Sequence, residues 1–434
     1  MECVSKLTRL FLVKITTYIE IRRLTYHVMI VKPLKTTLLS LLFFITLINS
    51  YRCAKNTPND TTGFSDAAIQ RVFGNTISIN SPENYTNQAI PAYINADNGP
   101  VSDDKKATLG RVLFYDKALS TNGSIACASC HQQEFAFSDT AIQSKGVNGL
   151  TGRHSMRLIN ARFARESKFF WNERAASLEA QTTQPIQDHA EMGYSGVDGA
   201  PDINELLAKL NALDYYQELS AWAYNQSNSK KLLTENDLQE CLGAFIRSIQ
   251  SFDSKYDEGR RQLGNNQNNA PLPNFSNDEN AGLQLFSAPP IFDNTGNRIA
   301  GGLGCGGCHR APEFDIDPNT RNNGFVGTID DPTVLDLGNT RSPSIRDLVN
   351  PQGQLNGPLM HTGSINSLET LIGHYNRILV RPGNNQIDPR LTPGGLPQQL
   401  NVTPTERQQI ISFLETLSGK SVYTEAKWSN PFAP

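Results

Sequence analysis

The sequence predicts a mainly α-helical protein whose helices are joined by long irregular loops. Apolar residues recur at helical spacing in three segments, whereas no segment alternates apolar and polar residues as a series of strands would. The 434 residues include 32 glycines and 24 prolines, an abundance that favours irregular connections, and no Gly-X-Y period indicates collagen.

The first helical segment covers residues 204–224, and its apolar stripe consists of Leu206, Leu207, Leu210, Leu213 and Tyr216. The second begins where Thr234 and Asp237 are spaced for a capping box, in which each side chain accepts a hydrogen bond from the other residue's backbone N–H. Its apolar stripe includes Cys241, so we expect this thiol in the core.

The third helical segment lies near the end of the chain and has the clearest start signal. Thr403 is the expected N-cap, Pro404 occupies the first helical position and Glu406 completes a capping box. The apolar stripe that follows contains Ile410, Ile411, Leu414 and Leu417. In contrast, residues 257–280 are polar, rich in Asn and without a period, which predicts an exposed linker between two domains.

The N-terminal segment, residues 1–55, is expected to be a leader. Its apolar run, residues 38–48, follows Lys32 and Lys35 and is too short to span a bilayer, which favours a secretory signal. We therefore expect an exported protein of the bacterial cell envelope, in the periplasm. Cys53 follows the run at a distance that leaves lipid anchoring open, although Tyr51 and Arg52 are bulky for such a site.

The charge and cysteine content exclude several classes of protein. With 39 Lys and Arg against 42 Asp and Glu, the net charge is −3, which excludes a nucleic-acid coat protein and a polybasic membrane binder. Seven cysteines are too few for a disulfide scaffold of this length.

Four of the cysteines belong to two copies of the pattern Cys-x-x-Cys-His. The copies are Cys127, Cys130 and His131, and Cys305, Cys308 and His309. Two thiols at this spacing can bond the two vinyl-derived carbons of one haem edge, and the histidine that follows can ligate the iron. A zinc site and a redox dithiol are the competing interpretations, but neither explains a histidine after both pairs. The sequence therefore predicts two covalent haem c groups with His131 and His309 as proximal iron ligands.

Further segments resemble the bacterial di-haem cytochrome c peroxidase family, in its MauG-like branch. They are RHSMRLINARF, FFWNERAASLEAQTTQPIQDHAEMG, RSPSIRDLV and NGPLMHTGSINSLETLIGHYNRI, and the similarity runs from about residue 108 to 418. The resemblance implies two cytochrome c-like haem domains. Residues 56–275 would form the catalytic haem domain and residues 276–434 the electron-transfer haem domain, with a calcium ion between the haems.

The same resemblance assigns roles to individual residues. Trp171 matches the tryptophan between the haems, Gln181 and Glu191 match the residues of the distal pocket, and Pro185 matches a proline near that pocket. Peroxide cleavage also needs a group that takes a proton from one oxygen and returns it to the other, which a partly buried Glu191 can do. The phrase Phe169-Phe170-Trp171 leads us to expect a buried indole.

The sequence departs from the family in several places, among them Met156 where the family has a proline and Asn172 where it has an aspartate. Residues 132–153 contain no histidine that could cap the catalytic haem, so we expect this haem to be open without reductive activation. His154 stands where the family has an asparagine that helps to bind calcium. Asn356 and Pro358 fall where the family supplies backbone oxygens, so calcium remains an expectation from the resemblance alone.

Tyr375 is the expected distal ligand of the second haem. It continues the apolar stripe of Leu368, Leu371 and Ile372, so it faces inward. The resemblance adds that peroxidases of the family have a methionine here and the MauG-like enzyme a tyrosine. A core tyrosine is the alternative, and Met360 and His361 are rival ligands.

Three functions follow from these expectations. The first is a periplasmic peroxidase that reduces hydrogen peroxide with electrons from a small cytochrome or copper protein. The second is a MauG-like oxidase that modifies residues of a partner protein through a high-valent bis-iron state. The third is a non-catalytic electron carrier. A homodimer is left open.

Overall fold

The computed structural model describes residues 64–165, 167–227, 229–263 and 270–432. The expected leader and Cys53 lie outside these residues. Within them, no helix is both long and apolar enough to cross a membrane.

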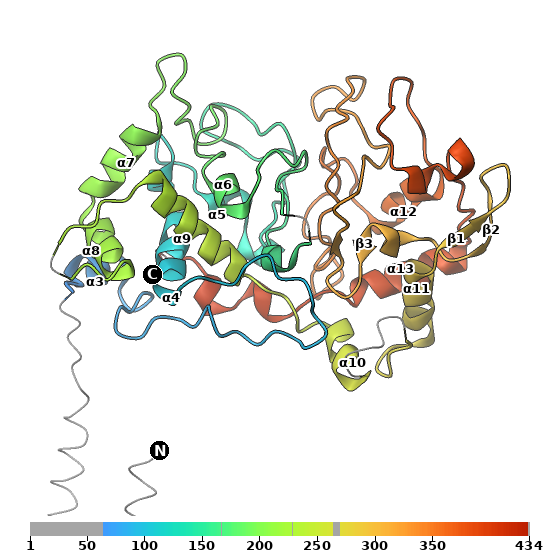
Figure 1. Ribbon diagram of the computed structural model, residues 1–434, viewed down its shortest axis with the longest axis horizontal. Helices are drawn as coiled ribbons and strands as arrows, with labels where there is room; N and C mark the ends of the chain where they lie inside the picture. The colour runs from blue at the N-terminus through green and yellow to red at the C-terminus, as the bar shows by residue number, and fades with distance from the viewer. Residues whose placement is uncertain (1–63, 166, 228, 264–269, 433–434) are drawn as a thin grey trace, which may run out of the picture. The chain divides into compact units, whose positions relative to one another are not determined.

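The described chain is mainly helical, as predicted, and Figure 1 shows its helices joined by long loops. The helices are α3 (Ala67–Phe73), α4 (Asp104–Tyr115), α5 (Cys127–Cys130), α6 (Leu178–Thr182), α7 (Ile203–Ala212), α8 (Asp214–Ala223), α9 (Glu235–Ser248), α10 (Lys255–Leu263), α11 (Asn277–Ser287), α12 (Leu368–Asn376) and α13 (Pro404–Glu415). Two short antiparallel pairs supply the strands, β1 (Pro290–Phe292) with β2 (Arg298–Gly301) and β3 (His309–Arg310) with β4 (Asp315–Ile316).

Helices α4 and α9 pack against each other and organise a first hydrophobic core. Asp103 caps α4 by accepting hydrogen bonds from two backbone N–H groups, and the predicted Thr234–Asp237 capping box starts α9. The helices cross at Gly110, where a Cβ atom would stand 1.9 Å from the carbonyl oxygen of Cys241. Cys241 is fully buried in this core, as expected.

Helices α11 and α13 form the equivalent pair of a second hydrophobic core. Capping boxes at Ser276 and Thr403 start the two helices, the latter as predicted. Gly282 lies at the crossing, because a Cβ there would stand 2.0 Å from the carbonyl oxygen of Gln409. Each core thus pairs a helix before a Cys-x-x-Cys-His motif with a helix after it, as Figure 1 shows.

The end of the chain returns from the second core to the first, where Val422 and Trp428 are buried. Each fully buried apolar side chain of this size contributes roughly 1.5–3 kcal/mol relative to an exposed one. The boundary between domains near residue 275 stays a prediction.

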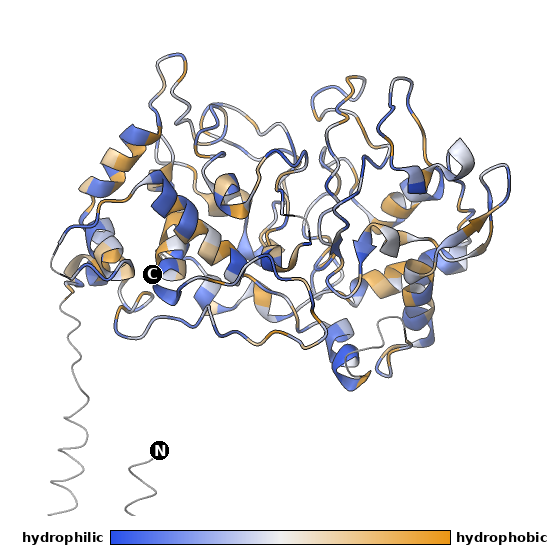
Figure 2. Cartoon of the chain, in the orientation of Figure 1, coloured by the Kyte–Doolittle hydropathy of each residue, from blue (hydrophilic) through white to orange (hydrophobic). Residues whose placement is uncertain are grey.

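The expected helix over residues 204–224 is divided in two. Leu213 is extended (φ −81°, ψ 126°) and serves as both the C-cap of α7 and the N-cap of α8. Figure 2 shows hydrophobic and hydrophilic residues alternating along α7, and Leu206 and Leu210 form its buried face.

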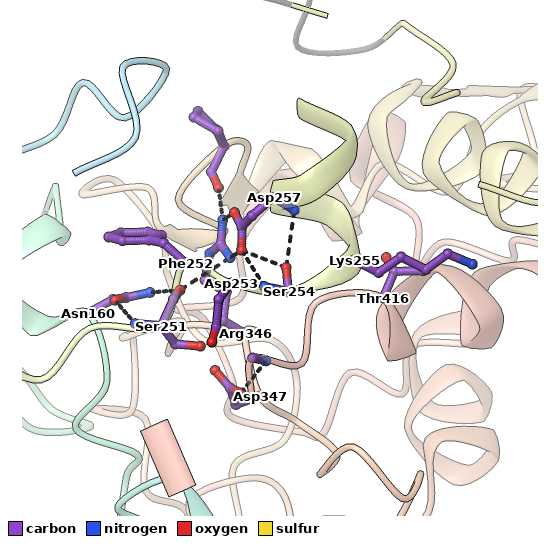
Figure 3. A network of polar contacts seen from close by, with 12 residues as sticks. Asn160, Ser251, Phe252, Asp253, Ser254, Lys255, Asp257, Arg346, Asp347 and Thr416 are labelled. Atoms are coloured by element: carbon purple, nitrogen blue, oxygen red, sulfur yellow. Dashed lines mark hydrogen bonds and ion pairs between the residues drawn. The ribbon is translucent and has the colours of Figure 1, made fainter. Parts of the chain in front are cut away.

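The expectation of an exposed linker over residues 257–280 was wrong for the described part of that range, residues 257–263 and 270–280. Helix α10 begins at Lys255 and α11 at Asn277, and Tyr256, Asp257 and Arg260 are fully buried. Asp257 is buried because Arg346, itself without exposed surface, pairs with both of its carboxylate oxygens at 3.0 Å (Figure 3). Asp257 can thus lie in the interior because its charge is paired with Arg346, 89 residues away in the sequence.

Candidate active site

The first Cys-x-x-Cys-His motif lines a cavity of about 440 Å³. Cys127 and Cys130 are the end residues of α5, and His131 follows as its C-cap. Burial raises the pKa of the Cys127 thiol to about 12 and that of Cys130 to about 11. The cavity therefore brings together two neutral thiols and an imidazole, the three groups that a covalent haem requires.

The hydrogen bond and the protonation state of the His131 ring suit an iron ligand. Its Nδ1 atom lies 3.2 Å from the carbonyl oxygen of Phe137, and burial lowers the pKa of the ring. If Nδ1–H donates to this carbonyl, the neutral imidazole keeps the Nε2 lone pair for a metal.

The second motif adjoins a smaller cavity of about 110 Å³ that His309 lines. Cys305 begins a 3₁₀ turn, residues Cys305–Gly307, and His309 begins β3. Burial, helped by the charges of Arg157 and Arg390, lowers the pKa of His309 to about 4. This ring is also neutral at pH 7. The residues of both cavities thus fit covalent haem c.

Glu191, Gln181, Trp171 and Pro185 all line the first cavity, and their roles there stay predictions. Burial raises the pKa of Glu191 to about 7; the charge of Asp188 adds to the increase, and Arg174 opposes it. At neutral pH this carboxyl group can therefore both accept and donate a proton.

Backbone contacts hold the segment that carries Glu191. The Asp188 carboxylate accepts hydrogen bonds from the backbone N–H groups of Ala190 and Glu191, at 2.9 and 3.0 Å. The backbone N–H of Val147 donates to the carbonyl of Glu191 at 2.9 Å. A Cβ at Gly146 would stand 2.0 Å from the carbonyl oxygen of Ala190, so only glycine permits this approach.

Arg174 is a cation in the wall of the first cavity to which the sequence gave no role. Its guanidinium lies over the ring of Phe170, 3.4 Å from the centroid, and donates to Gln184 and Asn172 at 3.2 Å. In sequence it resembles any solvated arginine of a polar loop, and only the fold brings its charge to Glu191.

Tyr375, Met360 and His361 all line the second cavity with His309. The Tyr375 hydroxyl accepts a hydrogen bond from Nδ2 of Asn323 at 2.9 Å, and the sulfur of Met360 lies 3.6 Å from the same nitrogen. The Nε2 atom of His361 lies 2.8 Å from the carbonyl oxygen of Gly327. Tyr375 and Met360 thus both contact the side-chain amide of Asn323. Which residue ligates the second haem iron stays a prediction.

The two cavities share a wall. The residues that line both are His154, Ser155, Met156, Arg157, Trp171, Arg341 and Pro343. Trp171, which was expected to be buried, is only partly buried, because it lines both cavities. Its backbone carbonyl accepts hydrogen bonds from Thr340 and Arg341, at 3.0 and 3.1 Å.

Calcium binding by Asn356 and Pro358 stays a prediction, and the Oδ1 atom of Asn356 is a buried oxygen without a hydrogen-bond partner. Asn356 is fully buried and its amide nitrogen donates to the Asp347 carbonyl and the Tyr423 hydroxyl, both at 2.9 Å. Pro358 lines the second cavity. Calcium requires six to eight oxygen ligands, but His154 offers an imidazole where the family has an asparagine. Within the described ranges, no group of three or more His, Cys, Asp or Glu could hold a metal.

Comparisons with known proteins agree with this arrangement. Residues 104–265 match the family model described as di-haem cytochrome c peroxidase. The chain is 26% identical over 331 residues to the methylamine utilization protein MauG of Methylophilus methylotrophus, covering 74% of this chain and 85% of the relative. It is 25% identical over 368 residues to the cytochrome-c peroxidase IdrP1 of Denitromonas iodatirespirans, covering 76% and 85%.

A similar solved structure is that of a MauG-like protein associated with microbial copper homeostasis. It superposes with a TM-score of 0.60 and 26% sequence identity, covering 80% of this chain and 99% of that one. The match extends beyond the residues of the family model and agrees with a cytochrome c-like architecture. Residues 104–265 thus match the di-haem cytochrome c peroxidase family, the chain is similar to MauG and cytochrome-c peroxidase relatives over about three quarters of its length, and it is an oxidoreductase.

Proposed function

We propose that the protein reduces hydrogen peroxide to water, taking the two electrons from a small redox protein of the cytochrome c type. Haem c, when bound, supplies the iron at which peroxide binds and through which electrons pass. The observation that carries the proposal is Glu191, which lines the cavity of the first haem motif and whose pKa burial raises to about 7.

Glu191 would take the proton from one peroxide oxygen and return it to the other, which leaves as water. Two protons and two electrons from outside the peroxide complete the balance to two water molecules. The charge of Arg174, close enough to act on Glu191, would stabilise the negative charge that develops when the O–O bond breaks. Gln181 would orient peroxide from α6.

Electrons would enter at the second cavity and cross the wall that contains Trp171. His309 and Tyr375 line the second cavity, and Trp171 lines both. The indole is the one large aromatic ring among the described residues shared by the two cavities, which supports a relay role.

A MauG-like oxidase that modifies a partner protein is the second candidate. Tyr375 beside His309 favours it, because an anionic oxygen ligand favours the oxidised iron and would make the second haem a poor acceptor from a cytochrome. A non-catalytic electron carrier is the third candidate, although the cavity beside His131 argues against it.

Donor oxidation by the holoprotein separates the three candidates. Protein whose intact mass shows two covalent haems is mixed with a reduced small c-type cytochrome and hydrogen peroxide. A peroxidase oxidises two cytochromes per peroxide, rapidly. Slow cytochrome oxidation, with oxidation of a partner protein, would favour the MauG-like function. If neither haem bound cyanide, the carrier would remain.

Export to the periplasm accords with covalent haem, which bacteria attach outside the cytoplasm. The proposal keeps the leader of residues 1–55, with lipid attachment at Cys53 and a homodimer as further alternatives. Cell fractionation and N-terminal sequencing of the mature protein test the location and the start of the chain.

A further inference from the structure

Two adjacent tyrosines of α8 share one buried carboxylate. The hydroxyl groups of Tyr215 and Tyr216 both donate a hydrogen bond to the Oδ2 atom of Asp116, each at 2.8 Å. Their ring centroids are 4.6 Å apart, and the ring planes are tilted by 39°. Two phenols in contact with each other thus face a single proton acceptor.

Asp116 suits the role of proton acceptor. Loss of one electron turns a phenol into a strong acid, so a buried tyrosine is oxidised readily only where a base can take its proton. The Oδ1 atom of Asp116 accepts from the backbone N–H of Ala118 at 2.7 Å, in addition to the two phenols at Oδ2. Hydrogen bonds of this kind favour the ionised carboxylate, which can take the proton of either tyrosine.

The pair lies near the attachment site of the first haem. Asp116 follows the end of α4, two residues after Phe114, which lines the first cavity. Helix α4 contacts both α8 and α5, the helix that carries Cys127 and Cys130. Cys127 packs against the core in which Tyr216 is fully buried. Burial and the charge of Asp116 raise the pKa of Tyr216, and Cys127 is near enough to add to this increase.

Tyr215 continues from Tyr216 toward the surface. Tyr216 has no exposed surface, whereas Tyr215 is partly exposed. The ring of Tyr215 also meets those of Phe73 and Phe432 edge to face, with centroids 5.7 and 6.5 Å away. Phenylalanine is much harder to oxidise than tyrosine. An oxidising equivalent that reaches Tyr215 therefore stays there until a reductant from solution meets the ring.

We propose that Tyr216 and Tyr215 form a redox-active pair that carries an oxidising equivalent from the first haem to the surface when no electron donor is bound. Tyr216 gives one electron to the oxidised haem site and its phenolic proton to Asp116. One electron then passes from Tyr215 to Tyr216, while Asp116 returns a proton to Tyr216 and takes that of Tyr215. An electron from a small reductant in solution, such as ascorbate, together with the proton from Asp116, restores Tyr215.

The pair would protect the site by discharging an oxidant that has no donor to consume it. The inference rests on the peroxide reaction of the proposed function, because that reaction supplies the oxidising equivalent. It does not depend on which partner protein donates electrons in normal turnover.

Rapid-freeze electron paramagnetic resonance tests the pair in protein that carries two covalent haems. After hydrogen peroxide is added without a donor, the wild type should show a protein radical. Its signal should narrow in protein produced with ring-deuterated tyrosine, which separates it from a radical at Trp171. The signal should be lost in Tyr216→Phe. In Tyr215→Phe it should persist, and ascorbate should quench it more slowly. Asp116→Asn keeps the size of the side chain but cannot take the proton, so it should lower the radical yield.

Tyr85→Phe is the matched control, because Tyr85 is fully buried in the same core but donates to the backbone carbonyl of Lys427, at 2.8 Å, instead of to a carboxylate. This variant should keep the wild-type radical yield. The inference would be overturned by haem spectra that respond to peroxide without a tyrosyl radical, by a wild-type signal in Tyr216→Phe, or by loss of the signal in Tyr85→Phe.

Haem spectra that peroxide leaves unchanged would instead reject the proposed function. Flash oxidation with a photoexcited ruthenium polypyridyl complex then replaces peroxide as the one-electron oxidant. A radical that is lost in Tyr216→Phe and kept in Tyr85→Phe would still support the pair, whereas equal yields in the two variants would reject it.

Discussion

The indole nitrogen of Trp171 donates a hydrogen bond to the backbone carbonyl of His154, 2.8 Å away, within the wall shared by the two cavities. The backbone N–H of His154 in turn donates to the carbonyl of His361 at 2.8 Å, and the rings of Trp171 and His361 meet edge to face. The orientation of the indole between the cavities is therefore fixed by backbone, and this rigidity suits an electron relay.

Replacing Trp171 should slow electron transfer between the haems. Trp171→Phe keeps an aromatic ring but loses the indole N–H and its hydrogen bond to the His154 carbonyl. Rapid-mixing absorbance should show slower oxidation of the second haem after peroxide is added, with unchanged haem content. Trp222→Phe is the control, because Trp222 is buried in the first core, away from both cavities. Equal rates in the wild type and Trp171→Phe would remove the relay role.

The buried pair of Asp257 and Arg346 should matter for stability. Asp257→Asn leaves the guanidinium buried without a counter-charge, a change that typically costs about 3–5 kcal/mol of unfolding free energy. Asp214→Asn breaks the exposed pair with Arg71 and should cost about 1 kcal/mol or less. Denaturant titration of the two variants measures both values. Similar losses for the two variants would show that burial does not set the importance of the Asp257 pair.

Much of the fold was predictable because its signals are local. The capping residues Thr234 and Thr403 and the apolar stripes after them place α9 and α13 correctly. The burial of Asp257 was not predictable, since it depends on Arg346, which is distant in sequence.

In the candidate site, too, the residues with a local sequence pattern were predictable and those placed by distant contacts were not. Motif residues such as Cys127 and His309 were found from their spacing, and the position of Glu191 came from the resemblance. Arg157 and Asn323 were missed because each lies in a loop, where sequence does not distinguish a solvated polar residue from one in a cavity wall.

Tyr375→Met should raise the reduction potential of the second haem. A thioether ligand favours ferrous iron more than a tyrosine oxygen does, so a methionine-ligand absorption band should appear and electron entry from a donor should become faster. Met360→Leu is the control, since Met360 lies beside the same Asn323 amide. A thioether band already present in the wild type and lost in Met360→Leu would assign the ligand to Met360 and leave Tyr375 as a core residue.

Peroxide turnover should depend on pH through Glu191. Below its pKa of about 7 the carboxyl group is protonated and cannot accept the peroxide proton, so kcat/KM should fall about tenfold per pH unit below that value and level off above it. Asp188→Asn removes a charge that raises this pKa, so the fall of kcat/KM should begin at a lower pH in this variant. A profile that is flat through pH 7, or one that Asp188→Asn does not move, would assign the proton transfer to another group.

Peroxide turnover by Glu191→Gln is the most direct test of the proposed chemistry. The substitution keeps the shape of the side chain but removes the proton acceptor, and loss of a general acid–base group costs about 10²-fold or more in rate. With two covalent haems and wild-type haem spectra in both proteins, steady-state peroxide reduction should fall by about this factor in the variant. Nearly full activity in Glu191→Gln would contradict the central claim that this carboxyl group moves the proton.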